Sequence, residues 1–250
     1  MYINDTHILY YVVAAIFGLF VGQFVEWMNR RLLNNQKIFD KEMFQELKID
    51  FKPNYILMLI TSTIYVALVY RYGIQNTIIG NLNLIKYVML TPLLLSAFVI
   101  DYKKQIIPNR LNLTILELGL IITFIYGMSN ATIAVDMLLG SIIGCGIFFI
   151  ISLLGSFIYG KEALGFGDVK LMGALGLYFG VTNIVAISIT SFLIGAIIGI
   201  FLIITRIKKI DEYIPFGPFI VIGTFICIFI PSSMITKVLV TIFTFGIYKN

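Results

Sequence analysis

The feature that most constrains the fold is a series of continuous apolar runs, several of them close to 20 residues long. About 20 apolar residues are enough for one helix to cross the hydrocarbon core of a bilayer. Hydrophobic residues make up 59% of the chain and charged residues only 12%, whereas an ordinary soluble chain is about a quarter charged. The runs do not alternate as the strands of an outer-membrane barrel do. The sequence therefore predicts an all-α, polytopic transmembrane helical bundle of about eight helices.

Short polar breaks separate the predicted helices from one another. Their ranges are 7–28, 55–72, 84–101, 111–128, 133–158, 169–181, 183–205 and 216–231. A last apolar run, 233–248, is either a ninth span or an interfacial tail. The first run has no basic stretch before it and no small-residue cleavage site after it, so we interpret it as a retained helix and not a signal peptide.

The basic residues predict the orientation of the bundle. Fourteen of the 18 Lys and Arg residues lie in the breaks after the first, third, fifth and seventh predicted helices. Basic loops stay on the cytoplasmic side, so we expect the N-terminus outside and these breaks in the cytoplasm. The net charge of +5 follows from this topology. No aromatic-interleaved basic patch is present, so the lipid bilayer is an expected partner and nucleic acid is not.

Two aspartates stand in polar breaks that this topology places on the same face. Asp101 opens Asp-Tyr-Lys-Lys-Gln-Ile-Ile-Pro-Asn, and Asp168 closes Gly-Phe-Gly-Asp. Ionisable side chains at membrane depth are costly and usually functional. Two carboxylates that share one proton are the working parts of an aspartic protease, in which the ionised one takes a proton from water and the neutral one protonates the scissile carbonyl. The pair therefore predicts peptide-bond hydrolysis.

Asp101 and Asp168 could also have purely structural roles. Asp168 could cap the helix that follows it, and Asp101 could be a solvated residue at a helix end. The only histidine, His7, lies on the predicted opposite face, which argues against a Ser-His or Cys-His site and against a His-ligated metal. The two cysteines, Cys145 and Cys227, lie inside apolar runs and are expected to be small buried side chains.

Several ordered motifs resemble the type IV prepilin peptidases, the bacterial leader peptidases of pilins and of type II secretion pseudopilins. Asp101 to Asn109, with Pro108, is similar to their first aspartate box. The second box is matched by Gly165 to Met172, which includes Gly167, Asp168 and Lys170. Ile214 to Phe219, with Pro215 and Gly217, resembles their IPFGP motif, and Asp136 to Gly140 fits between the boxes. The N-terminal segment from Gly18 to Leu32 is also similar, but has Gln23 and Glu26 where Ser and Asn are usual.

The resemblance implies N-terminal helices at 1–90 with a short cytoplasmic loop at about 30–54, a peptidase core at 91–232, and a C-terminal tail or last span at 233–250. The alternating charges of the 30–54 loop predict a solvated amphipathic helix. Gly140, Gly144 and Gly146 predict close helix packing.

The implied enzyme is an aspartic endopeptidase of the bacterial inner membrane, with its active site facing the cytoplasm. It would cut prepilins after the glycine that joins a short basic leader to an apolar helix. Asp101 and Asp168 would be catalytic, and Pro108, Asn109, Gly165, Gly167, Lys170, Pro215, Gly217 and Glu26 would support the substrate or the motifs. Proteolysis needs no cofactor and no metal. Many members also methylate the new N-terminus with S-adenosylmethionine, which is the expected cofactor if this activity is present. The sequence leaves the oligomeric state open.

Two rival functions stay open at this stage. A presenilin-like intramembrane protease also uses Gly-x-Gly-Asp, but its partner aspartate lies within a helix, whereas Asp101 precedes a polar loop. A small transporter would place its acids near the middle of the membrane, far from each other.

Overall fold

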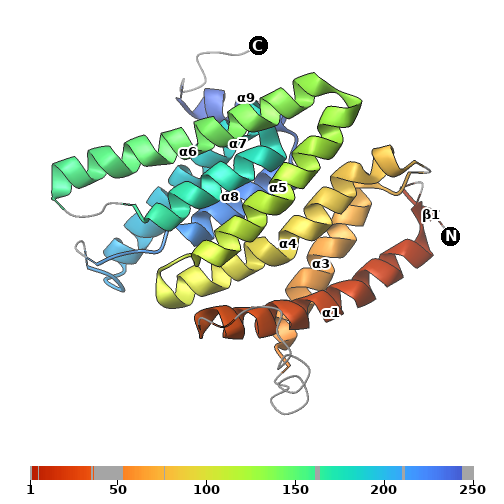
Figure 1. The fold of residues 1–250 in the computed structure, drawn as a ribbon. Helices are drawn as coiled ribbons and strands as arrows, with labels where there is room; N and C mark the ends of the chain where they lie inside the picture. The colour runs from red at the N-terminus through yellow and green to blue at the C-terminus, as the bar shows by residue number, and fades with distance from the viewer. Residues whose placement is uncertain are drawn as a thin grey trace. The chain divides into compact units, whose positions relative to one another are not determined.

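The computed structural model describes residues 2–4, 6–34, 36, 53–75, 77–160, 164–209 and 212–243. The chain divides into two compact units, Met1–Ile100 and Asp101–Asn250. The elements are β1 (Tyr2–Ile3), β2 (Thr6–His7), α1 (Ile8–Leu33), α3 (Tyr55–Tyr72), α4 (Ile78–Lys104), α5 (Asn109–Ser129), α6 (Ala131–Tyr159), α7 (Phe166–Ile204), α8 (Gly217–Phe229) and α9 (Ser232–Phe243) (Figure 1). The boundary between the units falls inside α4.

The described residues confirm the predicted fold class. They form eight helices and one short antiparallel ribbon, in which β1 pairs with β2. Six of the helices, α1 and α3 to α7, are long and apolar enough to cross a membrane. Most of the predicted 30–54 helix lies outside the described residues.

In the first unit, α1 and α3 pack closely against each other. Two glycines of α1 allow this approach, because a Cβ on Gly18 would lie 2.5 Å from the Cα of Ser62, and one on Gly22 would lie 2.5 Å from the Cα of Met58. The motif glycines at this end of the chain therefore serve backbone contact between helices.

The second unit is built around α7, which packs against α5, α6, α8 and α9 (Figure 1). The predicted close packing is confirmed at Gly140 and Gly144 of α6. Their Cβ positions would lie 2.8 Å and 2.6 Å from the carbonyl oxygens of Gly176 and Met172 in α7. The prediction is wrong for Gly146, since a Cβ there meets nothing within 4 Å.

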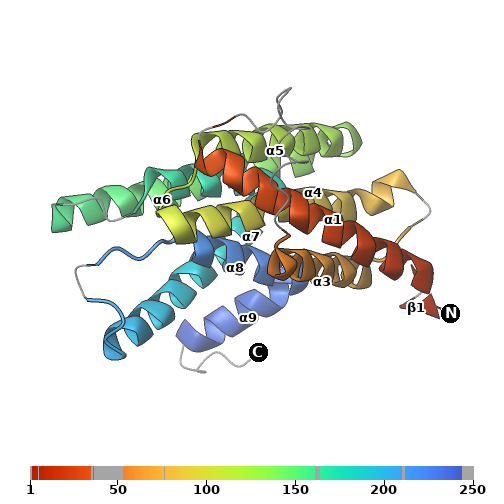
Figure 2. The same cartoon turned by 90° about the horizontal axis from the view of Figure 1, so that it is seen from below.

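Helix α7 is a folded pair of helices, as the two predicted ranges 169–181 and 183–205 require. Gly180 has φ 70° and ψ −177°, which interrupts the helix. A straight helix of 39 residues would be about 58 Å long. Yet Tyr213, nine residues after the end of α7, lines the same pocket as Phe166 at its start, and nine extended residues reach at most about 32 Å. The chain therefore turns back at Gly180, and the two parts can be followed in Figure 2.

The two last helices are shorter than a membrane span. Helix α8 has 13 residues and the described part of α9 has 12, fewer than the roughly 20 that a span needs. The last residues of the predicted 233–248 run, 244–248, lie outside the described residues. Helix α8 matters most for the site, because its first residue contacts Asp101.

Candidate active site

Asp101 lies in the last turn of α4, and only 2% of it is exposed. The helix ends after Lys104, where Gln105 adopts a left-handed conformation with φ 58° and its N–H donates to the Asp101 carbonyl at 2.8 Å. Such a residue is a common helix stop. The backbone N–H of Gly217, the first residue of α8, donates to Asp101 Oδ2 at 2.9 Å. This bond links the first aspartate box to the IPFGP motif.

Asp168 lies in the first turn of α7 and is 3% exposed. It is not the N-cap, because that position is held by Gly165, which makes no side-chain capping bond. Asp168 is the third residue of the helix, from which an acidic side chain can reach back to the N-cap backbone, so capping describes part of its role. Asp168 Oδ1 is buried and has no hydrogen-bond partner among the described residues, although the backbone of Gly165 interacts with the carboxylate. Asp168 thus has acceptor capacity that the described fold does not use.

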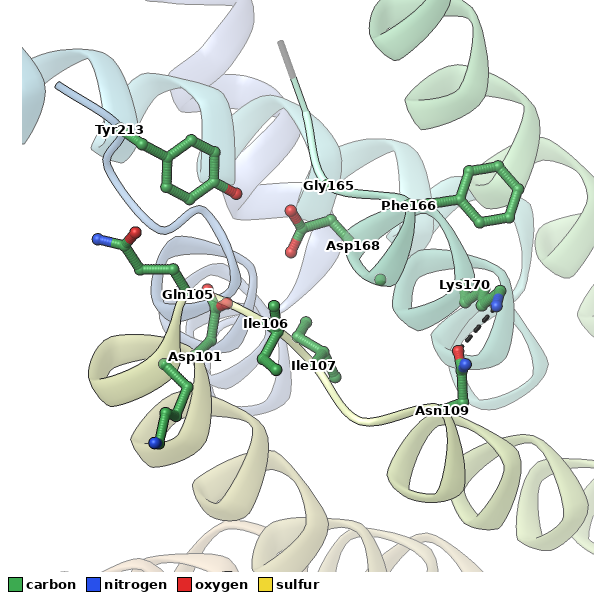
Figure 3. Close-up of a pocket in the computed structure, with 12 residues that line it drawn as sticks. Asp101, Gln105, Ile106, Ile107, Asn109, Gly165, Phe166, Asp168, Lys170 and Tyr213 are labelled. Carbon is green, nitrogen blue, oxygen red and sulfur yellow. Dashed lines mark hydrogen bonds between the residues drawn. The ribbon is translucent and has the colours of Figure 1, made fainter. Parts of the chain in front are cut away.

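The two aspartates come together at one pocket of about 630 Å³ (Figure 3). Asp101 lies close enough for its charge to act on Asp168. Both carboxylates also stand at helix N-termini, Asp168 on its own helix α7 and Asp101 against α8, where free backbone N–H groups favour negative charge. The pocket is lined by Asp101, Lys104, Gln105, Ile106, Ile107, Asn109, Gly165, Phe166, Gly167, Asp168, Lys170 and Tyr213.

Four of the motif-supporting residues predicted from sequence line the same pocket: Asn109, Gly165, Gly167 and Lys170. Lys170 Nζ donates to Asn109 Oδ1 at 2.8 Å, which joins the start of α7 to the start of α5 (Figure 3). Lys170 also lies 5.2 Å from the centroid of the Phe166 ring. The bond holds the two aspartate boxes side by side.

The two predicted prolines shape the backbone around the pocket. Pro108 is the N-cap of α5, and its carbonyl accepts bonds from Leu111 and Asn112 at 3.0 and 3.2 Å. Pro215 lies in the segment just before α8, which delivers Gly217 to Asp101. Neither proline is a lining residue.

Glu26 lies in the first unit, in α1, and its carboxylate already has partners. Asn54 Nδ2 donates to Glu26 Oε2 at 2.9 Å, and Arg30 Nε lies 3.6 Å from Oε1. Asn54 also donates its backbone N–H to Gln23 Oε1 at 3.1 Å. The two residues that depart from the family pattern, Gln23 and Glu26, thus connect the end of α1 to the start of α3.

Two residues at the site were missed by the sequence reasoning. Asn112 is 4% exposed and donates from Nδ2 to the Gly167 carbonyl at 2.9 Å, which holds the Gly-Phe-Gly-Asp turn against α5. A polar Asn within an apolar run is a signal that could have found it. Tyr213 points its hydroxyl toward Asp168 across the pocket (Figure 3). Its only sequence signal is that it lies near Pro215.

The expectation that both cysteines are buried is wrong. Cys145 is exposed on α6 and Cys227 is half-buried. An apolar run in a membrane protein does not reveal which of its residues face inward, because lipid accepts apolar side chains on the outer face.

The structure also corrects the argument that separated this site from a presenilin-like one. Asp101 does precede the non-helical residues 105–108, but it lies within α4, one turn before the end of the helix. Its position relative to a helix therefore does not distinguish the two kinds of protease. Both aspartates do lie at the ends of long helices and not in the middle, which disfavours the transporter interpretation.

Comparisons with known proteins support the resemblance. Residues 88–200 match the type IV leader peptidase family. A prepilin leader peptidase/N-methyltransferase of Xanthomonas campestris pv. campestris is 29% identical over 181 residues, 72% of this chain and 60% of the relative. Proteins of the same name from Aeromonas hydrophila and Pseudomonas aeruginosa are 31% and 33% identical over 140 residues, 56% of this chain and 47% of each relative.

The chain therefore spans about half to three-fifths of the length of these relatives. No solved structure gives a significant match. The family match contains both aspartate boxes, from Asp101 to Asn109 and from Gly165 to Met172. The segment 88–200 of this chain is thus similar to the type IV leader peptidase family.

Proposed function

We propose that this protein is a membrane aspartic endopeptidase that removes the leader of type IV prepilins or pseudopilins, with Asp101 and Asp168 as the catalytic pair. The observation that carries the proposal is that two buried carboxylates from different helices line one pocket at the ends of those helices. The family match agrees with this chemistry.

Hydrolysis by this pair uses one water molecule. The water oxygen bonds to the scissile carbonyl carbon, one carboxylate takes the water proton, and the other carboxyl group protonates the carbonyl oxygen. The tetrahedral intermediate then collapses: the second carboxylate takes back a proton from one hydroxyl group of the intermediate, the C–N bond breaks, and the first carboxyl group gives its proton to the leaving amine. Both carboxylates end as they began, and the atoms of water are divided between the new acid and the new amine.

The contacts of the two aspartates suggest different roles. Asp101 Oδ2 accepts the Gly217 N–H at the start of α8, and a hydrogen bond to a carboxylate favours its ionised form. The backbone of Gly165 also interacts with the Asp168 carboxylate, but Asp168 Oδ1 has no described partner, so a proton on this oxygen is not held by another acceptor and can be donated. We assign Asp101 as the base and Asp168 as the acid in the first step.

The substrate and its location follow from the relatives and from the charge pattern. The relatives are named for prepilin leaders, and the basic loops favour a cytoplasmic site in the bacterial inner membrane. Under this proposal the basic leader lies on the cytoplasmic side, and the bond after its last glycine enters the pocket.

N-methylation with S-adenosylmethionine stays a prediction that rests on the names of the relatives. Glu26, the residue assigned from sequence to substrate support, has its carboxylate bonded to Asn54 and beside Arg30. This arrangement does not offer Glu26 as a free contact for a sulfonium group.

The test is cleavage of a co-expressed prepilin by Asp101→Asn and Asp168→Asn variants. Both substitutions keep the side-chain size and remove the acid, so we expect cleavage to fall by a factor of at least about 10³, the scale on which loss of a proton-transfer group acts. Mass spectrometry of the prepilin would report the cut position and any added methyl group. Glu117→Gln is the matched control, because Glu117 is an exposed acid of α5 outside the pocket. Full cleavage by either Asn variant would refute the catalytic pair.

A further inference from the structure

A second pocket, of about 400 Å³, lies beside the first in the second unit. It is lined by Asn109, Asn112, Leu113 and Leu116 of α5, Ser141 and Cys145 of α6, and Lys170 and Gly173 of α7. Two of these residues, Asn109 and Lys170, also line the pocket of the aspartates. The bond from Lys170 Nζ to Asn109 Oδ1, 2.8 Å long, stands where the two pockets meet.

The second pocket leads away from the helix ends and into the apolar part of the unit. Its lining on α5 begins at the first residue, Asn109, and continues to Leu116. Seven residues of helix advance about 10 Å. Its far part is formed by Leu113, Leu116, Ser141 and Gly173, while Asn109 and Lys170 lie at the end shared with the first pocket. The groove is thus charged where it meets the aspartates and mainly apolar farther along, where Ser141 is its polar residue.

We propose that this groove, defined by its eight lining residues, holds the apolar segment of the substrate that follows the scissile bond. The inference rests on the proposed function, since it needs a peptide cut at the Asp101–Asp168 pocket. A peptide bound there must leave on both sides of the bond. Its apolar side requires an apolar path that begins at the pocket, and the groove shares two wall residues with it.

Lys170 is suited to guide the chain from one pocket to the other. Its described partners, Asn109 Oδ1 and the Phe166 ring, are both neutral. An ammonium has three N–H donors, so donors remain for the peptide carbonyls of a crossing chain. Asn109 and Lys170 would then separate to admit the chain, each exchanging its bond to the other for one to the backbone of the substrate.

Gly173 and Cys145 lie against each other in the wall of the groove. Gly173 has no side chain, and a Cβ there would lie 3.2 Å from the Cβ of Cys145. Cys145 is a free, exposed cysteine in the wall. The groove therefore carries its own site for cross-linking.

The first experiment is disulfide cross-linking in membrane vesicles. The enzyme carries two substitutions: Asp168→Asn prevents turnover, and Cys227→Ser leaves Cys145 as its only cysteine. A set of prepilin variants carries one cysteine each, at successive positions after the cleavage site. We expect cross-links in the first turns of the apolar segment, repeating every three to four residues. The control enzyme has Cys145→Ser with Leu153→Cys, because Leu153 is 55% exposed on the same helix but outside the groove. Cross-links from the control alone, or from neither enzyme, would overturn the proposal.

The second experiment narrows the groove in the active enzyme. Leu113→Trp fills it, whereas Ile121→Trp adds the same bulk to α5 at a residue that is also 55% exposed but outside the lining. We expect Leu113→Trp to raise the KM for a full-length prepilin about tenfold, the scale of one misfitted apolar group, and to leave unchanged the cleavage of a short peptide that ends just after the cut site. Equal effects on both substrates would overturn the proposal. If the unmodified enzyme cleaved neither substrate, the proposed function itself would fail.

Unchanged KM for both substrates would mean that the substrate does not occupy the groove, and would also overturn the proposal. The melting temperature of each Trp variant in detergent separates a misfolded protein from a blocked groove.

Discussion

At the scale of single residues, the site depends on which atoms contact the two carboxylates. Asp101 receives a backbone N–H from Gly217 at 2.9 Å, and the turn that carries Asp168 is held by Asn112 at 2.9 Å. Each support is a single hydrogen bond made by a residue other than the aspartate. A small change at either support should therefore alter activity before it alters the fold.

Gly217→Ala should reduce activity while the protein remains folded. An added Cβ would lie 2.7 Å from Asp101 Oδ2 and 3.0 Å from its Cγ, so the carboxylate has to move. A displacement of about 1 Å in a catalytic group can cost on the order of 100-fold in rate. We expect kcat to fall by about that factor with a smaller change in KM. Gly146→Ala is the control, because nothing lies within 4 Å of its Cβ position; equal kcat values for the two variants would contradict this role of Gly217.

At the scale of elements, the fold of α7 at Gly180 brings the start of one helix and the segment after the next to a single pocket. Gly180 has φ 70° and ψ −177°, a conformation that is essentially restricted to glycine. The N–H of Val181, the residue after the break, donates to Asp136 Oδ1 at 3.3 Å. The Asp136 motif therefore supports the turn between the two parts of α7.

Gly180→Ala should destabilise the protein. The substitution forces a side chain into a strained conformation, which costs about 1–3 kcal/mol, and the new Cβ would also clash with the Asp136 carboxylate. We expect a lower melting temperature in detergent, with a loss of activity that follows the loss of folded protein. Gly199→Ala, in the second part of α7, is the matched control because its Cβ would make only an ordinary contact of 3.9 Å with Ile214. If the two variants had the same melting temperature, the turn would not depend on glycine at position 180.

At the scale of the whole molecule, the orientation in the membrane decides whether a cytoplasmic leader can reach the site. The predicted orientation rests on the distribution of Lys and Arg among the loops. It places the segment before α5 in the cytoplasm and the far end of α5 outside. Two exposed residues mark the ends of this helix: Ile106 lies just before it and Met128 lies in its last turn.

Single cysteines at Ile106 and Met128, in a protein with Cys145→Ser and Cys227→Ser, should differ in their labelling by a membrane-impermeant maleimide. We expect Met128→Cys to react in intact spheroplasts, and Ile106→Cys to react only after the inner face is opened. The two residues are 63% and 78% exposed, respectively, so both are accessible to reagent once it reaches them. The reverse pattern would place the pocket outside and would contradict cleavage of a cytoplasmic leader.

The sequence alone determined the helical class and most helix positions, because a helix that crosses a bilayer needs a long, continuous apolar run, which is easily recognised in a sequence. It also determined Asp101 and Asp168 as candidates, since isolated acids in such a chain are rare and costly. The apolar runs also predicted two separate helices, 169–181 and 183–205, and the structure interrupts α7 at Gly180. In contrast, Glu26 had a plausible place in a motif, but its contacts with Asn54 and Arg30 come from the packing of α1 on α3.

Only the tertiary structure decided which polar groups support the two acids. Asp101 and Gly217 are 116 residues apart in the chain, and Asn112 and Gly167 are 55 apart. Tyr213 reaches the pocket only because α7 turns back on itself. In a membrane the apolar pattern does not mark which side of a helix faces its neighbours, because lipid and protein interior are equally apolar. The contacts between helices, and with them the groove beside the aspartates, therefore depend on shape, on glycine gaps and on hydrogen bonds that form only in the folded chain.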